Sequence, residues 1–333
     1  MQLKYLHLSF LTCLILSGCN DARIADPLSQ ALQNGLPTRA QNAILTEKVH
    51  VRLDQKQTIT YKMVANGSSL YLSGRPFGYS SWDITSNPLA PRLQFAYSNN
   101  INAFGPNPDW LPDYYASGAM AVMGRYVVSS GAAGASLIDN GVPDQAREIK
   151  RYPQRLPSDL QVPQDPDYVY KAIVTHPSEP YFFGFREQDF VTSLQLDGSG
   201  LNLRKKTPYA VNGQKGTCCV LGGATFKGFA YIAFRSSIRK YIFGTNGSIQ
   251  EGGVFDGVNG TNIVATNDLL FVQHQAVPGN TLASGIYVIN GGGAAIAFLP
   301  ILPISFVVSP DNRYIYANMD NDSITIFQIN WSQ

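Results

Sequence analysis

The sequence predicts an all-β protein that folds as a single β-propeller of six four-stranded blades, closed by an N-terminal strand. The first observation is a repeat of roughly 40 to 55 residues, a spacing typical of propeller blades. The second is the composition: 14% of the residues are charged, and Gly, Tyr and Phe are frequent, as expected for strands joined by tight turns. The third is that the last repeat lacks one strand, which the segment before the first repeat can supply.

Each repeat contains an aromatic strand followed by a marker strand that ends in Asp or Asn. These two residue types suit the end of a strand because their side chains bond the following backbone and tolerate unusual φ angles. Ahead of the aromatic strand lies an inner strand of small or branched residues, which fits the crowded axis of a propeller. The aromatic strands begin at Leu70, Tyr126, Tyr181, Tyr231, Leu270 and Tyr314, and the marker strands end at Asp83, Asp139, Asp197, Asn246, Asn290 and Asn330.

The strand that closes the ring is expected within residues 47–53. Val49 and Val51 alternate there with His50 and Arg52, which is the period of two of a half-buried strand. Pairing this segment with the last marker strand completes the sixth blade and protects the edges of the sheets.

The first residues have the layout of a secretory signal. Lys4 gives a positive start, residues 6–16 form an apolar run, and Leu-Ser-Gly-Cys closes it at Cys19. The run is shorter than the roughly 20 residues of a membrane-spanning helix. Leu-Ser-Gly-Cys resembles the lipobox of bacterial lipoproteins, and this resemblance implies cleavage before Cys19 and acylation of its thiol, with palmitate among the acyl chains. The alternative is an ordinary signal peptide with an incidental cysteine.

These expectations divide the chain into a signal peptide (residues 1–18), a flexible tether that starts at lipidated Cys19 (residues 19–46) and the propeller (residues 47–333). A short helix around residues 28–36 is possible within the tether. Two or three acyl chains hold a protein at a membrane far better than one, so we expect a cell-envelope protein. Asn20, rather than Asp, follows the cysteine, which favours the outer membrane over the inner membrane.

The last predicted blade carries the clearest family resemblance. Residues 309–318, followed by residues 323–327, resemble the YVTN or lactonase-like propeller repeat, and the second blade is similar to an LVIVD repeat. The resemblance implies the fold and leaves the activity open.

Charge and motifs exclude several classes of function. The 25 Lys and Arg nearly balance the 23 Asp and Glu, and the basic stripe of a nucleic-acid binder is missing from the sequence. The sequence contains no nucleophile elbow, Walker loop, dinucleotide fingerprint or His-Glu-x-x-His motif. His50, His176 and His274 fall in different predicted blades, so we do not expect a zinc site.

Calcium is the one cofactor that the family resemblance raises. Lactonase-like propellers of this shape hold calcium at the mouth of the channel with Glu, Asn and Asp, and Asn212 and Asn262 near the starts of inner strands are candidates for such ligands. Asn is also common in turns, and the family motifs do not match residue by residue. We therefore expect no cofactor, with a metal-dependent hydrolase as the alternative.

Cys218 and Cys219 are adjacent in the sequence. In an oxidising envelope, the two cysteines that remain after lipidation of Cys19 are expected to pair, although adjacent Cα atoms lie closer together than ordinary disulfides prefer. Such a disulfide would form a rigid apolar platform or a structural clip. Two packed free thiols are the alternative.

Two long segments, residues 98–118 and 153–168, each run from an outer strand to the next inner strand. They should emerge on one face of the disc, together with the connection that carries Cys218 and Cys219. Aromatic platforms beside carboxylates suit a sugar, a cationic group or a peptide, and the alternative is that the rings fold back to cap the disc. The predicted ligand-binding residues are Trp110, Tyr114, Tyr115, Asp109, Asp113, Asp165 and Asp167.

Together these features predict a lipid-anchored cell-envelope propeller that binds a ligand through its long-loop face without catalysis. The expected partners are an envelope protein, a peptide or a glycan, and the membrane through the lipid anchor, but no nucleic acid. A lactonase-like hydrolase and a structural envelope scaffold are the alternatives.

Overall fold

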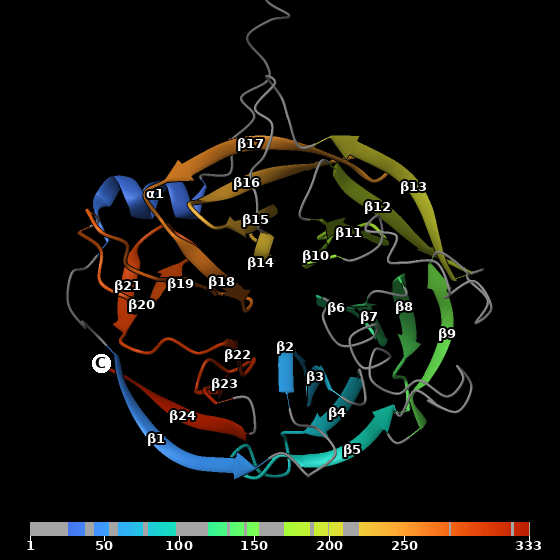
Figure 1. Cartoon of the computed structure of the whole chain (residues 1–333), viewed down its shortest axis with the longest axis horizontal. Helices are drawn as coiled ribbons and strands as arrows, with labels where there is room; N and C mark the ends of the chain where they lie inside the picture. The colour runs from blue at the N-terminus through green and yellow to red at the C-terminus, as the bar shows by residue number, and fades with distance from the viewer. Residues whose placement is uncertain are drawn as a thin grey trace, which may run out of the picture.

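The computed structural model describes the greater part of the chain as six four-stranded antiparallel sheets, arranged as blades in a ring (Figure 1). This arrangement confirms the predicted all-β propeller with six blades. The described residues are 26–36, 43–52, 59–75, 79–97, 119–131, 134–142, 145–152, 170–186, 190–198, 200–208, 220–279, 281–320 and 323–332.

Each blade runs outward from an inner strand at the axis to an outer strand at the rim, and five blades are consecutive in sequence. These five are β2 (Ile59–Asn66), β3 (Ser69–Arg75), β4 (Tyr79–Asp83) and β5 (Arg92–Tyr97); β6 (Met120–Met123), β7 (Tyr126–Gly131), β8 (Gly134–Asp139) and β9 (Arg147–Tyr152); β10 (Ala172–Thr175), β11 (Tyr181–Phe185), β12 (Phe190–Asp197) and β13 (Gly200–Pro208); β14 (Val220–Phe226), β15 (Phe229–Phe234), β16 (Ser237–Gly244) and β17 (Ser248–Asp256); and β18 (Gly260–Ala265), β19 (Leu269–His274), β20 (Gly285–Asn290) and β21 (Ala295–Leu299). The last blade consists of β22 (Ser305–Val308), β23 (Tyr314–Asn318), β24 (Ser323–Trp331) and β1 (Ala43–Arg52).

The antiparallel order gives the disc two different faces. On one face, which we call the connection face, each outer strand ends and the next inner strand begins. The other face, which we call the opposite face, carries the turns from each inner strand to the second strand of its blade. The connections that join strands at the connection face are residues 53–58, 98–119, 153–171, 209–219, 257–259 and 300–304.

The core lies between neighbouring blades, and the second strands supply its largest side chains. Phe182, Phe234 and Phe271 on these strands are fully buried, as expected for aromatic side chains that dominate core packing. The inner strands are crowded instead. A Cβ atom on Gly222 of β14 would lie 2.7 Å from Asn262 Oδ1 on β18, so this position close to the axis excludes a side chain.

The predicted marker residues stabilise the turns between third and fourth strands. Asp139 Oδ1 accepts a hydrogen bond from the backbone N–H of Gly141 (2.9 Å). The Asp83 carboxylate accepts hydrogen bonds from the Ser86 hydroxyl and from the hydroxyl and backbone N–H of Thr85. These bonds, with that of Ser86 contributing most, lower the pKa of Asp83 to about 2. The role proposed from the sequence for the strand-end Asp is therefore confirmed at these turns.

Closure of the ring by an N-terminal strand is also confirmed. Strand β1 pairs antiparallel with β24 from Ala43 opposite Trp331 to Arg52 opposite Ser323. Val49 and Val51 pack on the core of the neighbouring blades, as the alternation predicts. The strand begins at Ala43 rather than at residue 47, the predicted start.

Helix α1 (Pro27–Asn34) lies within the range that we expected to be a flexible tether. Leu28 and Ala31 are buried in the cluster between the blades that begin with β14 and β18, and the helix lies against the rim (Figure 1). The structure thus differs from the expected tether at residues 26–36 and 43–46, which form a docked helix and part of a strand. Among the described residues, no helix is long and apolar enough to cross a membrane.

A buried acidic residue fixes the start of α1. Asp26 caps the helix, its Oδ1 accepts a hydrogen bond from the Tyr231 hydroxyl (2.6 Å), and its Oδ2 lies 2.8 Å from Lys240 Nζ. Burial, and then the bond to Asp26, raise the pKa of Tyr231. Gly293, in the turn after β20 on the opposite face, has a φ of 77°, and a Cβ there would collide with Gln30. The first turn of α1 therefore sits at the opposite-face end of the rim.

Candidate functional site

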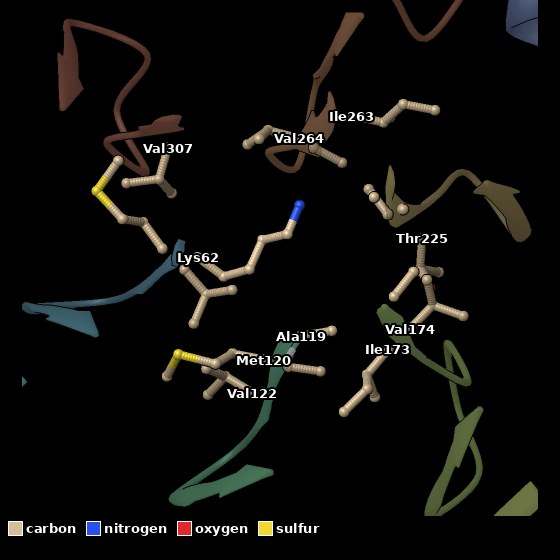
Figure 2. Close-up of a pocket in the computed structure, with 18 of the residues that line it drawn as sticks. Lys62, Ala119, Met120, Val122, Ile173, Val174, Thr225, Ile263, Val264 and Val307 are labelled. Atoms are coloured by element: carbon tan, nitrogen blue, oxygen red, sulfur yellow. The ribbon is translucent and has the colours of Figure 1, made fainter. Parts of the chain in front are cut away.

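The candidate site is the channel along the axis of the propeller. It forms a cavity of about 230 Å³ that is lined by all six inner strands, and Figure 2 shows side chains from these strands facing the central space. Most of the lining is small or aliphatic, such as Ala121, Val174 and Val264. Polar groups are few, so each of them decides what the channel can bind.

Lys62 on β2 is the most distinctive lining residue. Its side chain extends from β2 into the middle of the ring (Figure 2), and its Nζ donates a hydrogen bond to the backbone carbonyl of Leu221. Leu221 lies on β14, and the blades that begin with β2 and β14 stand on opposite sides of the ring (Figure 1). The ammonium group therefore reaches across the channel.

A second lysine lines the same cavity. Lys171 directly precedes β10, and its backbone N–H donates to the Phe185 carbonyl (2.8 Å). Burial, and then repulsion by the positive charge of Lys171, lower the pKa of Lys62 to about 8. Like charges in a poorly solvated space disfavour each other's charged form. The positive charge of Lys171 thus acts on the amine of Lys62.

The position of both lysines in their strands places them toward the connection face. Inner strands begin at that face, and Lys171 comes immediately before its strand while Lys62 lies in the first half of β2. Leu221 is the second residue of β14. The positively charged end of the channel is therefore the end where the chain enters each blade.

The described lining of the channel contains no acidic side chain. The lining residues contributed by β6, β14, β18 and β22 include no titratable side chain, and no Asp or Glu occurs among the described residues that line the cavity. Over the described ranges, no three His, Cys, Asp or Glu side chains group closely enough to hold a metal ion. The polar side chains that line the described channel therefore carry amine, amide and hydroxyl groups.

Asn262, one of the two predicted calcium ligands, does line the channel. Its Oδ1 accepts a hydrogen bond from the backbone N–H of Ile263 (3.0 Å) and lies against Gly222, so a local bond already uses this oxygen. Asn212 lies outside the described residues. Of the two predicted calcium ligands, Asn262 therefore lies in the channel, and the prediction for Asn212 stays untested.

The histidines lie in separate surroundings. His50 Nδ1 is 3.2 Å from Thr325 Oγ1 on the closing blade, His176 Nδ1 accepts from the backbone N–H of Glu179 (2.9 Å), and the buried His274 accepts from the N–H of Asn259 (3.0 Å). Each ring has its own local partner on a different element.

The residues predicted to be acylated, paired or ligand-binding lie outside the described residues. The segments that contain most of them join β5 to β6, β9 to β10 and β13 to β14, and all three junctions are at the connection face. This is the face toward which Lys62 and Lys171 lie. The undescribed predicted residues are Cys19, Trp110, Tyr114, Tyr115, Asp109, Asp113, Asp165, Asp167, Cys218 and Cys219.

Sequence reasoning missed both channel lysines. For Lys62, the available signal was one positively charged residue in the run Ile59-Thr60-Tyr61-Lys62-Met63-Val64. The repeat pattern predicts that this run is an inner strand. An isolated lysine is more often solvent-exposed, so this signal is weak without the ring geometry.

Comparison with known proteins supports the fold. No family model matches the chain, and no curated protein matches it. Among solved structures, the WD40 repeats of RRP9 superpose with a TM-score of 0.52 at 9% identity, covering 88% of this chain and 99% of that one. The computationally designed Ika8 protein gives a TM-score of 0.43 at 9% identity, over 81% of this chain and 70% of that one. The likeness to the WD40 repeats shows a propeller fold and no activity.

Proposed function

We propose that this chain is a lipid-anchored cell-envelope propeller that binds a ligand or an envelope partner at its connection face, without catalysis. The observation that carries the proposal is the axial cavity, which holds two lysines toward that face. Ligand sites in proteins are typically concave and mostly apolar, with a few polar groups that fix orientation. The axial cavity is concave and contains such polar groups, among them Lys62.

The lengths of the connections support the same face. Residues 98–119, 153–171 and 209–219 are long connections on neighbouring blades, whereas residues 257–259 and 300–304 are short. Long connections in compact domains are commonly functional. In this proposal, Trp110 and Tyr114 anchor the partner and the charged end of the channel receives one of its groups.

Helix α1 supports an orientation for the anchored protein. Asp26 is clamped at the opposite-face end of the rim, and the chain from Cys19 to Asp26 spans at most about 25 Å when fully extended. A lipid on Cys19 would hold the opposite face nearer to the membrane. The connection face would then point away from the membrane, toward a partner, and Asn20 favours the outer membrane as the site of attachment.

The proposed anchor is tested by changing Cys19→Ala in cells supplied with labelled palmitate. We expect the wild-type chain to be labelled and the variant to be neither labelled nor cleaved at this site. Equal labelling of both proteins would contradict the proposed lipidation.

The binding face is tested by chemical crosslinking in intact cells that carry wild type, Trp110→Ala or Tyr114→Ala. Truncation of a true aromatic anchor costs about 2 kcal/mol or more of binding free energy, so capture of the partner should fall strongly in both variants. Val254→Ala, a partly exposed position on β17 at the rim, is the matched control and should capture normally. Unchanged capture by the two aromatic variants, with circular dichroism showing folded protein, would rule out this face.

A further inference from the structure

We propose that the axial channel holds small aliphatic aldehydes through a reversible covalent bond, an imine between the Lys62 amine and the carbonyl carbon of the aldehyde. This inference rests on the proposed ligand-binding function and deepens it, because it names the class of ligand and the atom that binds it. It does not depend on the lipid anchor.

The first argument is the position of the Lys62 amine. The side chain extends from β2 into the central space of the ring (Figure 2) and is partly exposed there. Its Nζ donates a hydrogen bond to the Leu221 carbonyl on the far side of the channel. That bond uses an N–H group, so the lone pair of the uncharged amine is not engaged by it. A ligand that enters along the axis therefore meets a nucleophilic atom.

The second argument is the protonation state of this amine. A buried lysine is normally paired with a carboxylate, and the described lining of the cavity contains no Asp or Glu. Burial, and then the positive charge of Lys171, lower the pKa of Lys62 to about 8. Compared with an ordinary lysine, the uncharged fraction at pH 7 is roughly 200-fold larger. Poorly solvated lysines of this kind are the ones that form imines in proteins.

The third argument is the space and the hydrogen-bond donor beside the amine. Strand register places Gly222 of β14 and Asn262 of β18 at the position that Lys62 occupies in β2. Gly222 follows the carbonyl that Lys62 contacts and lies against Asn262. The hydrogen bond from the backbone of Ile263 uses Asn262 Oδ1, so the amide N–H groups of Asn262 can donate to a carbonyl oxygen. Such a donor polarises the carbonyl group for attack by the amine.

The fourth argument is the size and the lining of the cavity. Its volume of about 230 Å³ is smaller than the roughly 300–1,000 Å³ of pockets that hold drug-sized ligands. Val174, Val264 and Val307 surround the central space (Figure 2), and such side chains suit a short hydrocarbon chain. Because apolar surroundings limit the access of water, they also protect an imine from hydrolysis.

The reaction balances without any further reactant. The lone pair of the uncharged amine attacks the carbonyl carbon, a C–N bond forms, and one amine proton moves to the carbonyl oxygen. The resulting carbinolamine loses this oxygen as water, which carries away both protons of the original amine, and a C=N bond remains. Addition of water reverses each step. The aldehyde is therefore bound and released unchanged.

The first experiment treats the purified full chain at pH 7 with butanal and sodium cyanoborohydride, which reduces an imine to a stable butylamine. Peptide mass spectrometry compares the initial labelling rates of Lys62 and of the exposed Lys48. We expect Lys62 to be labelled at least about tenfold faster, because more of its amine is uncharged. Labelling of Lys62 at the rate of Lys48, or more slowly, would overturn the aldehyde site.

The second experiment replaces butanal with acetaldehyde and so separates binding in the channel from simple amine reactivity. Each methylene group that the lining buries should favour Lys62 by roughly fourfold. The ratio of Lys62 to Lys48 labelling should therefore be roughly tenfold higher with butanal, which has two more methylene groups. A ratio that does not depend on chain length would show a reactive amine without an aldehyde site, and the proposal would be wrong.

The third experiment uses variants of the full chain, with circular dichroism as the check of folding. Lys62→Arg keeps a positive charge but cannot form an imine, so fast butyl incorporation should disappear, whereas Lys48→Arg, the matched control, should keep it. Asn262→Ala retains the amine and should slow the labelling of Lys62 about fivefold, the loss of one hydrogen bond. If Lys62→Arg fails to fold, labelling of the wild-type chain still decides the question. Partner capture that persists when Lys62 fails to react would leave the proposed binding function standing.

Discussion

Lys62 shows how the interior of a propeller acts on a single charged residue. The residue directly follows the β-bulge of its inner strand, and strand register places Gly222 and Asn262 at the corresponding position of two other blades. Burial and the positive charge of Lys171 lower the pKa of Lys62, so the folded state disfavours the charged form of this amine. Residues of this kind are common at binding sites, where function is retained at the expense of stability.

The first prediction concerns the stability of Lys62→Met. The pKa of Lys62 is about 8 in the folded chain and about 10.4 when unfolded, so between these pH values the unfolded state binds more protons and wild-type stability rises with pH. The penalty of the buried charge is fully present below pH 8. Lys62→Met should therefore raise the free energy of unfolding by about 1–3 kcal/mol at pH 7, and this gain should vanish near pH 10.4.

Denaturant unfolding at pH 7 and pH 10 checks this prediction, with Lys48→Met as a control that should be near neutral at both values. A variant that is less stable than wild type at pH 7 would show that the Leu221 hydrogen bond outweighs the burial of the charge.

Some single residues were predictable from the sequence and others were not, for a physical reason. Asp83 and Asp139 act through bonds to residues that follow within a few positions, so a local pattern contains the necessary information. Lys62 and Lys171 meet only because the first and third blades share an axis. The chemistry of the channel therefore depends on closure of the ring, which no local pattern encodes.

At the scale of elements, α1 and β1 show what tertiary packing adds. A helix as short as Pro27–Asn34 is marginal alone, so the sequence indicates it only as a possibility around residues 28–36. Contacts of Leu28 and Ala31 with the propeller hold it in place. The start of β1 was also hidden, because Ile44 is an apolar residue that is 67% exposed and breaks the expected alternation. The sequence therefore predicts β1 without its first residues, and it indicates α1 only as a possibility.

The second prediction concerns the docking of α1. Asp26→Ala removes the helix cap and leaves Lys240 and the Tyr231 hydroxyl without their buried partner, and breaking a buried ion pair from one side typically costs about 3–5 kcal/mol. We expect α1 to detach while the blades remain folded. Hydrogen exchange should show faster exchange in residues 27–34 and unchanged exchange in β15 and β16.

The double variant Asp26→Ala with Lys240→Met is the matched comparison, because it removes both charges. It should restore part of the protection lost in Asp26→Ala. Loss of protection throughout the fourth blade (β14 to β17) would instead show that Asp26 supports the blade itself.

At the scale of the whole molecule, the fold was the most predictable property. Six repeats each predict the same kind of blade, so an error in one repeat does not change the predicted number of blades. The weak sequence signals were the boundaries and the small helix, which a repeat does not constrain. The likeness to the WD40 repeats of RRP9 at 9% identity shows that blade geometry persists when almost every side chain differs.

The third prediction tests ring closure. Val49→Asp with Val51→Asp places two charges against the core of the neighbouring blades, which should separate β1 from β24, lower the melting temperature by several degrees and cause aggregation through the exposed edge. Lys48→Asp with His50→Asp alters the exposed side of the same strand and should have a small effect. Melting curves and light scattering compare the two; equal melting temperatures would mean that β1 does not secure the ring.

The pairing of β1 with β24 also sets the order of events during synthesis. β1 is the first strand of the six blades to leave the ribosome and β24 is the last, so β1 has no hydrogen-bonded partner strand until β24 has been made. Five blades can form in turn as their strands emerge, because each consists of consecutive strands, whereas the sixth waits for the final segment. A product interrupted before Ser323 would carry two unpaired strand edges, at β1 and at β23, and such edges promote aggregation. Closure of the ring thus distinguishes a chain that contains β24 from one that does not, because only the former pairs both β1 and β23 with β24.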